Sequence, residues 1–173
     1  MDLLNSKQAF RLNPNDPSIL LVYGGNLYVV GRSQEGVDMI NRAARLSPNT
    51  PDVYYSYVDP FYATGRYEET IARARKTTGH NAWIQMVLAG SYARLGRQAE
   101  AAAAVAELSR LYPDFSTERM LSDFGRIKDP ATLAHYMEGA RKAGLNECAT
   151  AAELRKYPKM TRLAVCDAKR ATN

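Results

Sequence analysis

The strongest constraint on the fold is an internal period of 34 residues in the first half of the sequence. Gly31-Arg32 recurs as Gly65-Arg66, and Pro14 recurs as Pro48. Between these points apolar residues are spaced three and four apart, which places them on one side of a helix. Each unit is therefore expected to be two helices joined at the Gly-Arg turn. One such pair cannot bury its apolar side alone, so the period predicts a stack of helical hairpins.

The most regular copy is residues 17–50. A stripe of large and small residues runs along its first half, and the spacing continues in its second half until Pro48, which cannot continue a helix. Small residues let two antiparallel helices approach closely, and large ones fill the space between hairpins. The stripe consists of Leu20, Tyr23, Gly24, Leu27, Gly36, Ile40 and Ala43.

Two further copies and a half copy follow this pattern less regularly. Residues 51–81 keep aromatic side chains on the stripe, and residues 82–115 turn at Gly96-Arg97. In the second copy we expect a kink at Asp59-Pro60, a helix from Tyr67 to about Lys76, and a left-handed cap at Gly79. Residues 1–16 match the second helix of a unit, so we expect either a frayed N-terminal cap or a piece of a longer protein.

These residues resemble the tetratricopeptide repeat, whose pattern of Trp, Leu, Gly, Tyr, Ala, Phe and a terminal Pro recurs in degenerate form. The matching positions in residues 17–50 are Leu20, Tyr23, Gly24, Leu27, Gly36, Ile40 and Pro48. The resemblance implies an all-α fold, a right-handed α-solenoid of antiparallel helix hairpins, over residues 1–145. It divides them into a half repeat (1–16), three repeats (17–50, 51–81 and 82–115) and closing helices (116–145).

The segment from Pro113 to Leu145 resembles the closing part of the repeats in bacterial multidomain proteins, such as class III adenylate or guanylate cyclases with tetratricopeptide repeats. Within it, Ser116 and Asp129-Pro130 are predicted to start two helices. The resemblance implies an accessory, regulatory role and not a catalytic one, because no cyclase or DNA-binding motif is visible.

Residues 146–173 lie outside the repeats and are expected to form a solvated basic tail. From residue 116 to the end there are 11 Lys and Arg against 7 Asp and Glu. Among the basic residues from Arg155 to Arg170, Tyr157 is the one aromatic residue, so the sequence does not favour nucleic-acid binding. Cys148 and Cys166 fit neither a disulfide framework nor a Cys-x-x-Cys metal site, and two reduced thiols are expected. Without a signal peptide or a membrane span, the sequence predicts a cytoplasmic location.

No constellation of catalytic residues is evident. The two histidines, His80 and His135, form no metal-binding pair, and no phosphate-binding glycine loop occurs. The sequence therefore predicts neither an enzyme nor a bound cofactor or metal.

A binding surface is expected on the first helices of the hairpins, which line the concave side of such a stack. Aromatic residues and Met, which are enriched at protein interfaces, occur there together with one acid. An alternative is that several of these side chains pack against neighbouring helices. The expected groove residues are Leu21, Tyr28, Tyr55, Asp59, Tyr62, Trp83 and Met86.

The sequence thus favours a protein–protein interaction module that binds a peptide segment or a sister domain of the same polypeptide. The alternative is a regulatory repeat arm of a larger cyclase-type signalling enzyme. The oligomeric state and the partner do not follow from these residues.

Overall fold

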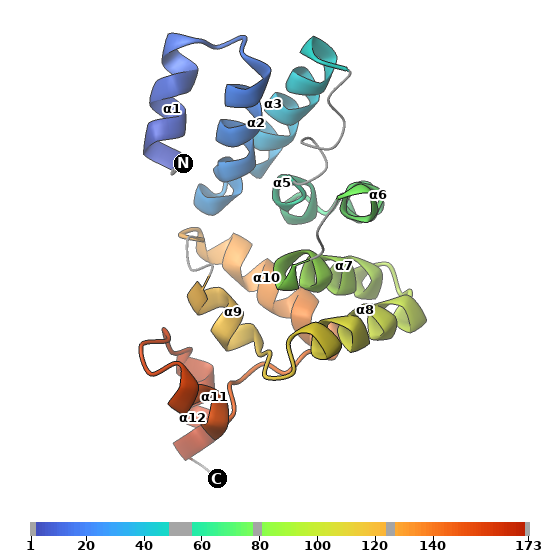
Figure 1. Ribbon diagram of the computed structural model, residues 1–173, viewed down its shortest axis with the longest axis vertical. Coiled ribbons are helices and arrows are strands. Elements are labelled where there is room, and N and C mark those ends of the chain that lie inside the picture. Colours follow the sequence, from blue (N-terminus) through green and yellow to red (C-terminus); the bar gives the residue numbers. More distant parts are fainter. Residues whose placement is uncertain (1–2, 49–56, 78–80, 124–126, 172–173) are drawn as a thin grey trace. The chain divides into compact units, whose positions relative to one another are not determined.

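The computed structural model describes residues 3–48, 57–77, 81–123 and 127–171, and all regular structure in these ranges is helical (Figure 1). The chain forms two compact units. Unit 1 comprises Met1–His80 and Ile127–Leu133, and unit 2 comprises Asn81–Arg126 and Ala134–Asn173. The first boundary between them lies between His80 and Asn81.

Unit 1 contains the first hairpins. Its helices are α1 (Leu3–Leu12), α2 (Pro17–Asn26), the short 3-10 helix η1 (Leu27–Val30), α3 (Ser33–Leu46), α5 (Asp59–Ala63) and α6 (Tyr67–Lys76). Helix α2 begins with Pro17 because Asp16 caps it. The Asp16 carboxylate accepts hydrogen bonds from the backbone N–H groups of Ser18 and Ile19, at 2.8 and 3.1 Å.

Helices α2 and α3 pack closely through glycine, as the small positions of the stripe predict. A Cβ atom built on Gly36 would lie 2.4 Å from the carbonyl oxygen of Gly24, and one on Gly24 would lie 2.8 Å from the Cβ of Met39. Neither position can therefore carry a side chain at this helix separation. The core beside this contact consists of Leu20, Leu21, Val37, Ile40, Ala43 and Phe61.

The Gly-Arg turn has the same geometry in all three copies. Each glycine has a positive φ, and the arginine N–H after it donates to a carbonyl five residues earlier, as in a Schellman cap. This recurrence shows that the period in the sequence is also a period in the backbone. The glycines are Gly31 (φ 77°), Gly65 (φ 76°) and Gly96 (φ 73°), and the bonds run from Arg32 to Leu27, from Arg66 to Phe61 and from Arg97 to Tyr92.

The predicted kink at Asp59-Pro60 falls at the start of a helix, because Tyr57 and Val58 are not helical and residues 49–56 lie outside the described residues. Helix α5 begins at Asp59, and Pro60 stands in its first turn. Proline is tolerated there because the first N–H groups of a helix have no partner within it. The predicted helix from Tyr67 to Lys76 is confirmed as α6, whereas Gly79 and His80 lie outside the described residues.

The segment Ile127–Leu133, which belongs to unit 1, packs against the first Gly-Arg turn. The N–H groups of Lys128 and Asp129 donate to the Val29 carbonyl at 2.7 and 3.1 Å. The Asp129 carboxylate caps α10 (Pro130–Lys142) by accepting from Thr132 N at 2.8 Å, as predicted. A Cβ atom on Gly31 would lie 2.9 Å from the Asp129 carboxyl carbon.

Gly31→Ala is therefore expected to destabilise the protein more than Gly96→Ala. Both variants force alanine into the left-handed region, at about 1–2 kcal/mol. Only Gly31→Ala also displaces the Asp129 carboxylate, which adds about 1 kcal/mol for the disturbed helix cap. Gly96 is the matched control because no atom lies within 4 Å of a Cβ placed there. Urea unfolding followed by circular dichroism measures both, and equal losses would contradict this account of the turn.

Unit 2 contains the third hairpin and the C-terminal helices (Figure 1). The hairpin is formed by α7 (Ala82–Arg94) and α8 (Gln98–Leu111). Every residue of α7 from Trp83 to Ala93 is buried, so this helix is central to the unit. The other helices are α9 (Thr117–Asp123), most of α10, α11 (Ala151–Lys156) and α12 (Ala164–Ala171).

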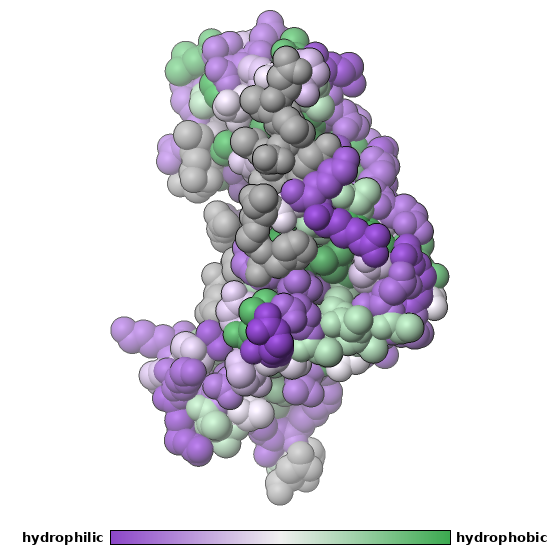
Figure 2. All heavy atoms as spheres, turned by 45° about the vertical axis from the view of Figure 1, so that its right-hand side comes forward, coloured by the Kyte–Doolittle hydropathy of each residue, from purple (hydrophilic) through white to green (hydrophobic). Residues whose placement is uncertain are grey.

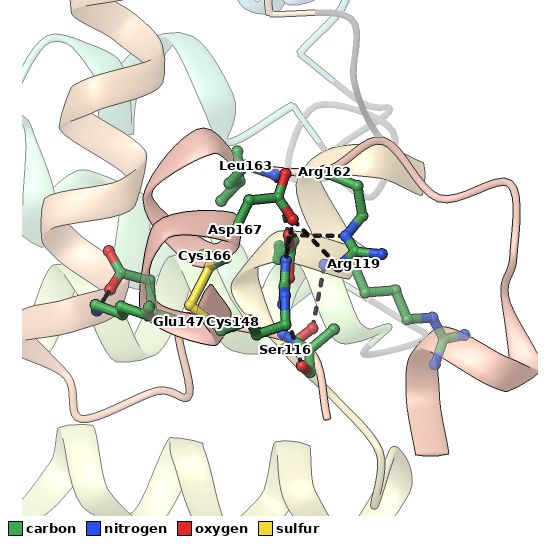
Figure 3. The surroundings of a disulfide bond; sticks show 12 residues. Ser116, Arg119, Glu147, Cys148, Arg162, Leu163, Cys166 and Asp167 are labelled. Carbon is green, nitrogen blue, oxygen red and sulfur yellow. Dashed lines mark hydrogen bonds and ion pairs between the residues drawn. A yellow bond between two sulfur atoms is a disulfide. The ribbon is translucent and has the colours of Figure 1, made fainter. Parts of the chain in front are cut away.

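The C-terminal segment differs from the expected solvated tail. It forms α11 and α12, and Cys148 and Cys166 are joined by a disulfide (Figure 3). The prediction of two reduced thiols is therefore wrong. The two sulfur atoms are bonded because the chain turns back on itself between α10 and α12. The spacing of 18 residues between the two cysteines does not indicate that turn.

Candidate functional site

The expected groove residues that the structure describes are mostly buried. The exposed fractions are 3% for Leu21, 7% for Tyr28, 1% for Tyr62, 6% for Trp83 and 2% for Met86. Asp59 is half-buried, and Tyr55 lies outside the described residues. Leu21, Tyr28, Asp59 and Tyr62 belong to unit 1, whereas Trp83 and Met86 belong to unit 2.

Two of the aromatic groove residues contact other rings of the chain. In unit 2 the Trp83 ring stacks on Tyr136 of α10, with centroids 5.3 Å apart. In unit 1 the Tyr62 ring meets Tyr67 of α6 edge to face at 5.8 Å. These contacts correspond to the alternative, that groove residues pack against neighbouring helices. A role of Tyr62 and Trp83 in binding a partner stays a prediction.

In unit 1 the first helices α2 and α5 contact each other. The Tyr57 ring covers Gly25 of α2 so closely that a Cβ there would lie 2.2 Å from its Cδ1 atom. Burial raises the pKa of the Tyr57 hydroxyl, although the side chain stays partly exposed. Asp59 follows two residues later in the first turn of α5, where a carboxylate complements the helix dipole.

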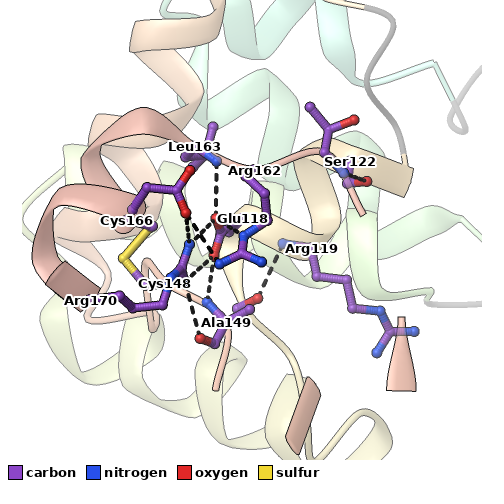
Figure 4. Close-up of polar contacts among 12 residues, drawn as sticks. Glu118, Arg119, Ser122, Cys148, Ala149, Arg162, Leu163, Cys166 and Arg170 are labelled. Atoms are coloured by element: carbon purple, nitrogen blue, oxygen red, sulfur yellow. Dashed lines mark hydrogen bonds and ion pairs between the residues drawn. A yellow bond between two sulfur atoms is a disulfide. The ribbon is translucent and has the colours of Figure 1, made fainter. Parts of the chain in front are cut away.

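A second polar site, which the sequence reasoning missed, lies in unit 2 around Glu118 of α9 (Figure 4). Its side chain is fully buried. The two carboxylate oxygens accept from Arg170 of α12, at 2.9 and 2.8 Å, and from the backbone N–H groups of Ala149 and Leu163, at 2.9 and 3.0 Å. The guanidinium of Arg162 lies 3.7 Å away. One carboxylate therefore joins α9 to three parts of the C-terminal segment.

The charge state of Glu118 follows from these contacts. Burial by itself raises the pKa of a carboxyl group, but the Arg170 hydrogen bonds and the two backbone donors outweigh it and lower the pKa of Glu118 from 4.5 to about 2. Arg170 is correspondingly held as a cation, and its pKa is raised by the hydrogen bonds to Glu118. The prediction of solvated basic residues is thus wrong for Arg170.

A neighbouring buried carboxylate, Glu153 of α11, has the opposite environment. Burial raises the pKa of Glu153, and this effect exceeds that of the Ser116 hydrogen bond and the Arg119 charge, which lower it. Arg119 is 4.0 Å away and also lies over the Tyr157 ring at 3.8 Å. Ser116 caps α9 as predicted, because its hydroxyl accepts from Arg119 N at 3.1 Å. This cluster holds α11 against the start of α9.

No group of three or more His, Cys, Asp or Glu among the described residues is placed to hold a metal ion. No helix in the described ranges is long and apolar enough to cross a membrane.

The face drawn in Figure 2 is largely hydrophilic, with a weakly apolar patch over α8. Ala99, Ala102, Ala103 and Ala106 of α8 are exposed.

The fold has a counterpart among solved structures. A crystal structure of MamA, a tetratricopeptide-like helical protein, matches with a TM-score of 0.55. The match covers 91% of this chain and 89% of that chain, at 16% sequence identity. The fold is tetratricopeptide-like. The helices confirm the predicted all-α class, whereas the right-handed α-solenoid stays a prediction.

The sequence comparisons identify no family for this chain. No protein-family model matches the chain, and no curated protein matches it. Nothing in the comparisons supports the resemblance to the repeats of nucleotide cyclases. At 16% sequence identity, the similarity to MamA supports a shared fold and implies no activity.

Proposed function

We propose that the chain is a protein-interaction module that binds a peptide segment of a protein partner on unit 1, along the first helices α2 and α5. The tetratricopeptide-like fold supports this, because such hairpins offer the surface of their first helices to partners. Leu21, Tyr28 and Tyr62 would form the supporting packing beneath that surface. Trp83 and Met86 would have the same supporting role in unit 2.

The observation that carries the proposal is that Tyr57, which covers Gly25 of α2, and Asp59, in the first turn of α5, are both partly exposed. Both side chains are half-buried, so each keeps an accessible part. A half-exposed aromatic ring supplies contact area at low entropy cost, and a partly desolvated carboxylate accepts a charge-assisted hydrogen bond. The pair therefore favours a peptide with a basic residue beside an apolar one.

The proposal is tested by selecting peptides from a displayed random library against the full chain and measuring the affinity of the selected peptides. Asp59→Asn is expected to weaken binding about tenfold and to reduce its dependence on salt, since a charge-assisted bond contributes about 1.5 kcal/mol or more. Asp38→Asn is the matched control, because Asp38 is exposed on α3 and bonded by Gln34.

Unchanged affinity in Asp38→Asn together with the loss in Asp59→Asn would support the site on α2 and α5. Equal weakening in both variants would indicate a general charge effect and contradict it. The absence of any enriched peptide would contradict the proposed function itself.

A further inference from the structure

Helix α12 has little apolar packing of its own. It is 8 residues long, and Cys166 is its one buried residue among those described. Val165, the other large apolar side chain of the helix, is 44% exposed. A helix this short is not stable in isolation, so contacts with the rest of the unit must hold it.

Those contacts are of two kinds. The first is the Cys148–Cys166 disulfide (Figure 3). The second is polar: Arg170 in the last turn of α12 and Leu163 N just before the helix both donate to Glu118. Lys169 also pairs with Glu147 at the surface. Among the described residues, the disulfide is thus the covalent attachment of α12, and it is made by the one buried residue of the helix.

We propose that the Cys148–Cys166 disulfide is a redox switch that holds α12 on α9 when oxidised and releases it when reduced. A dithiol reductant supplies the electrons. Its thiolate attacks the sulfur of Cys148 and the Cys166 thiolate leaves. The second thiol of the reductant then displaces Cys148 and closes the reductant's own disulfide. Two electrons and two protons have passed to the protein, and both cysteines are thiols.

The structure also indicates which half moves. The segment carrying Cys148 is fixed to α9 without the disulfide, because Thr117 N donates to the Asn146 carbonyl at 2.8 Å and Glu118 N to the Glu147 carbonyl at 2.9 Å. These are first-turn N–H groups of α9, which have no partner within their own helix. Cys148 therefore stays in place after reduction, and α12 is the part that leaves.

The order of attack fits the burial of the two cysteines. Cys148 is half-buried, whereas Cys166, a residue of α12, is fully buried. A reductant therefore reaches Cys148 first, and α12 separates once the bond has opened. Release removes Arg170 and Leu163 from Glu118 and leaves an acidic carboxylate at the start of α9. In an oxidising compartment the disulfide is formed and α12 is held on α9. In the predicted cytoplasmic location the thiol pool would keep both cysteines reduced and α12 released.

The test is hydrogen–deuterium exchange on the full chain, oxidised and after reduction with dithiothreitol, with free thiols titrated to confirm each state. The N–H groups of Cys166 and Asp167, which donate to the Leu163 carbonyl at 2.9 and 3.0 Å, are expected to exchange at least tenfold faster after reduction. Exchange in α7 and α8 is expected to stay unchanged. The Cys148→Ser/Cys166→Ser double variant should match the reduced chain without reductant and show no further change with it.

Two results would overturn the proposal. Equal protection of α12 in both redox states would show that the Glu118–Arg170 pair suffices to hold the helix. Loss of protection throughout unit 2 on reduction would make the disulfide a structural staple of the unit. Reduction of the already folded chain gives the answer even where the double variant does not fold.

Discussion

Glu118→Gln is expected to lower the free energy of unfolding of unit 2 by about 3 kcal/mol, because it removes the buried carboxylate that both terminal nitrogens of Arg170 bond and leaves Asp167, 3.0 Å away, as the carboxylate partner of Arg170. Trp83 is the only tryptophan and belongs to unit 2, so its fluorescence during urea unfolding reports this unit. Glu107→Gln is the control. Glu107 pairs with Arg110 at the exposed surface, where such a pair contributes about 0–1 kcal/mol.

The same pair gives a pH dependence. The pKa of Glu118 is lowered in the folded protein, so its contribution is fully present above the ordinary value of 4.5 and is lost as the pH falls toward about 2. Between pH 4.5 and about 2 the free energy of unfolding of the wild type is expected to fall by about 3 kcal/mol because Glu118 becomes protonated. Glu118→Gln lacks this contribution at every pH, so its stability is not expected to show this fall. Parallel stability curves for the two proteins between these pH values would contradict the proposed role of Glu118.

Trp83→Ala is expected to destabilise unit 2 by about 3–5 kcal/mol, since the ring is buried and stacked on Tyr136. Calorimetric unfolding measures the change, because the variant has no tryptophan fluorescence. Tyr112→Ala is the control, an aromatic truncation at a side chain that is 36% exposed, with an expected change within about 1 kcal/mol. A stable Trp83→Ala protein that has lost peptide affinity would instead assign the ring to the binding surface.

Local signals in the sequence predicted the hairpins well. The spacing of Gly24 and Gly36 indicated a close helix contact, and the structure has one. The recurrence of Gly-Arg predicted where the helices turn. Ser116 and Asp129 were recognisable as caps because capping depends on residues within the first helical turn. Each of these features is set by residues close together in the chain.

The features that the sequence did not predict depend on residues far apart. Glu118 looks like an ordinary acid in the first turn of a helix, and its partner Arg170 comes 52 residues later. The stacking partner of Trp83 is Tyr136, in a segment where the period is already lost. Periodicity shows which side of α7 is apolar, but it does not show which later helix covers that side. The sequence therefore indicated on which helices the expected groove residues lie, but it did not indicate that most of the described ones are buried.

Binding of a peptide to the first helices of unit 1 can be measured by hydrogen–deuterium exchange of the full chain with and without a selected peptide. We expect slower exchange in α2 and α5 when the peptide is bound, and unchanged exchange in α3 and α6. Protection confined to α3 and α6, with α2 and α5 unchanged, would contradict it.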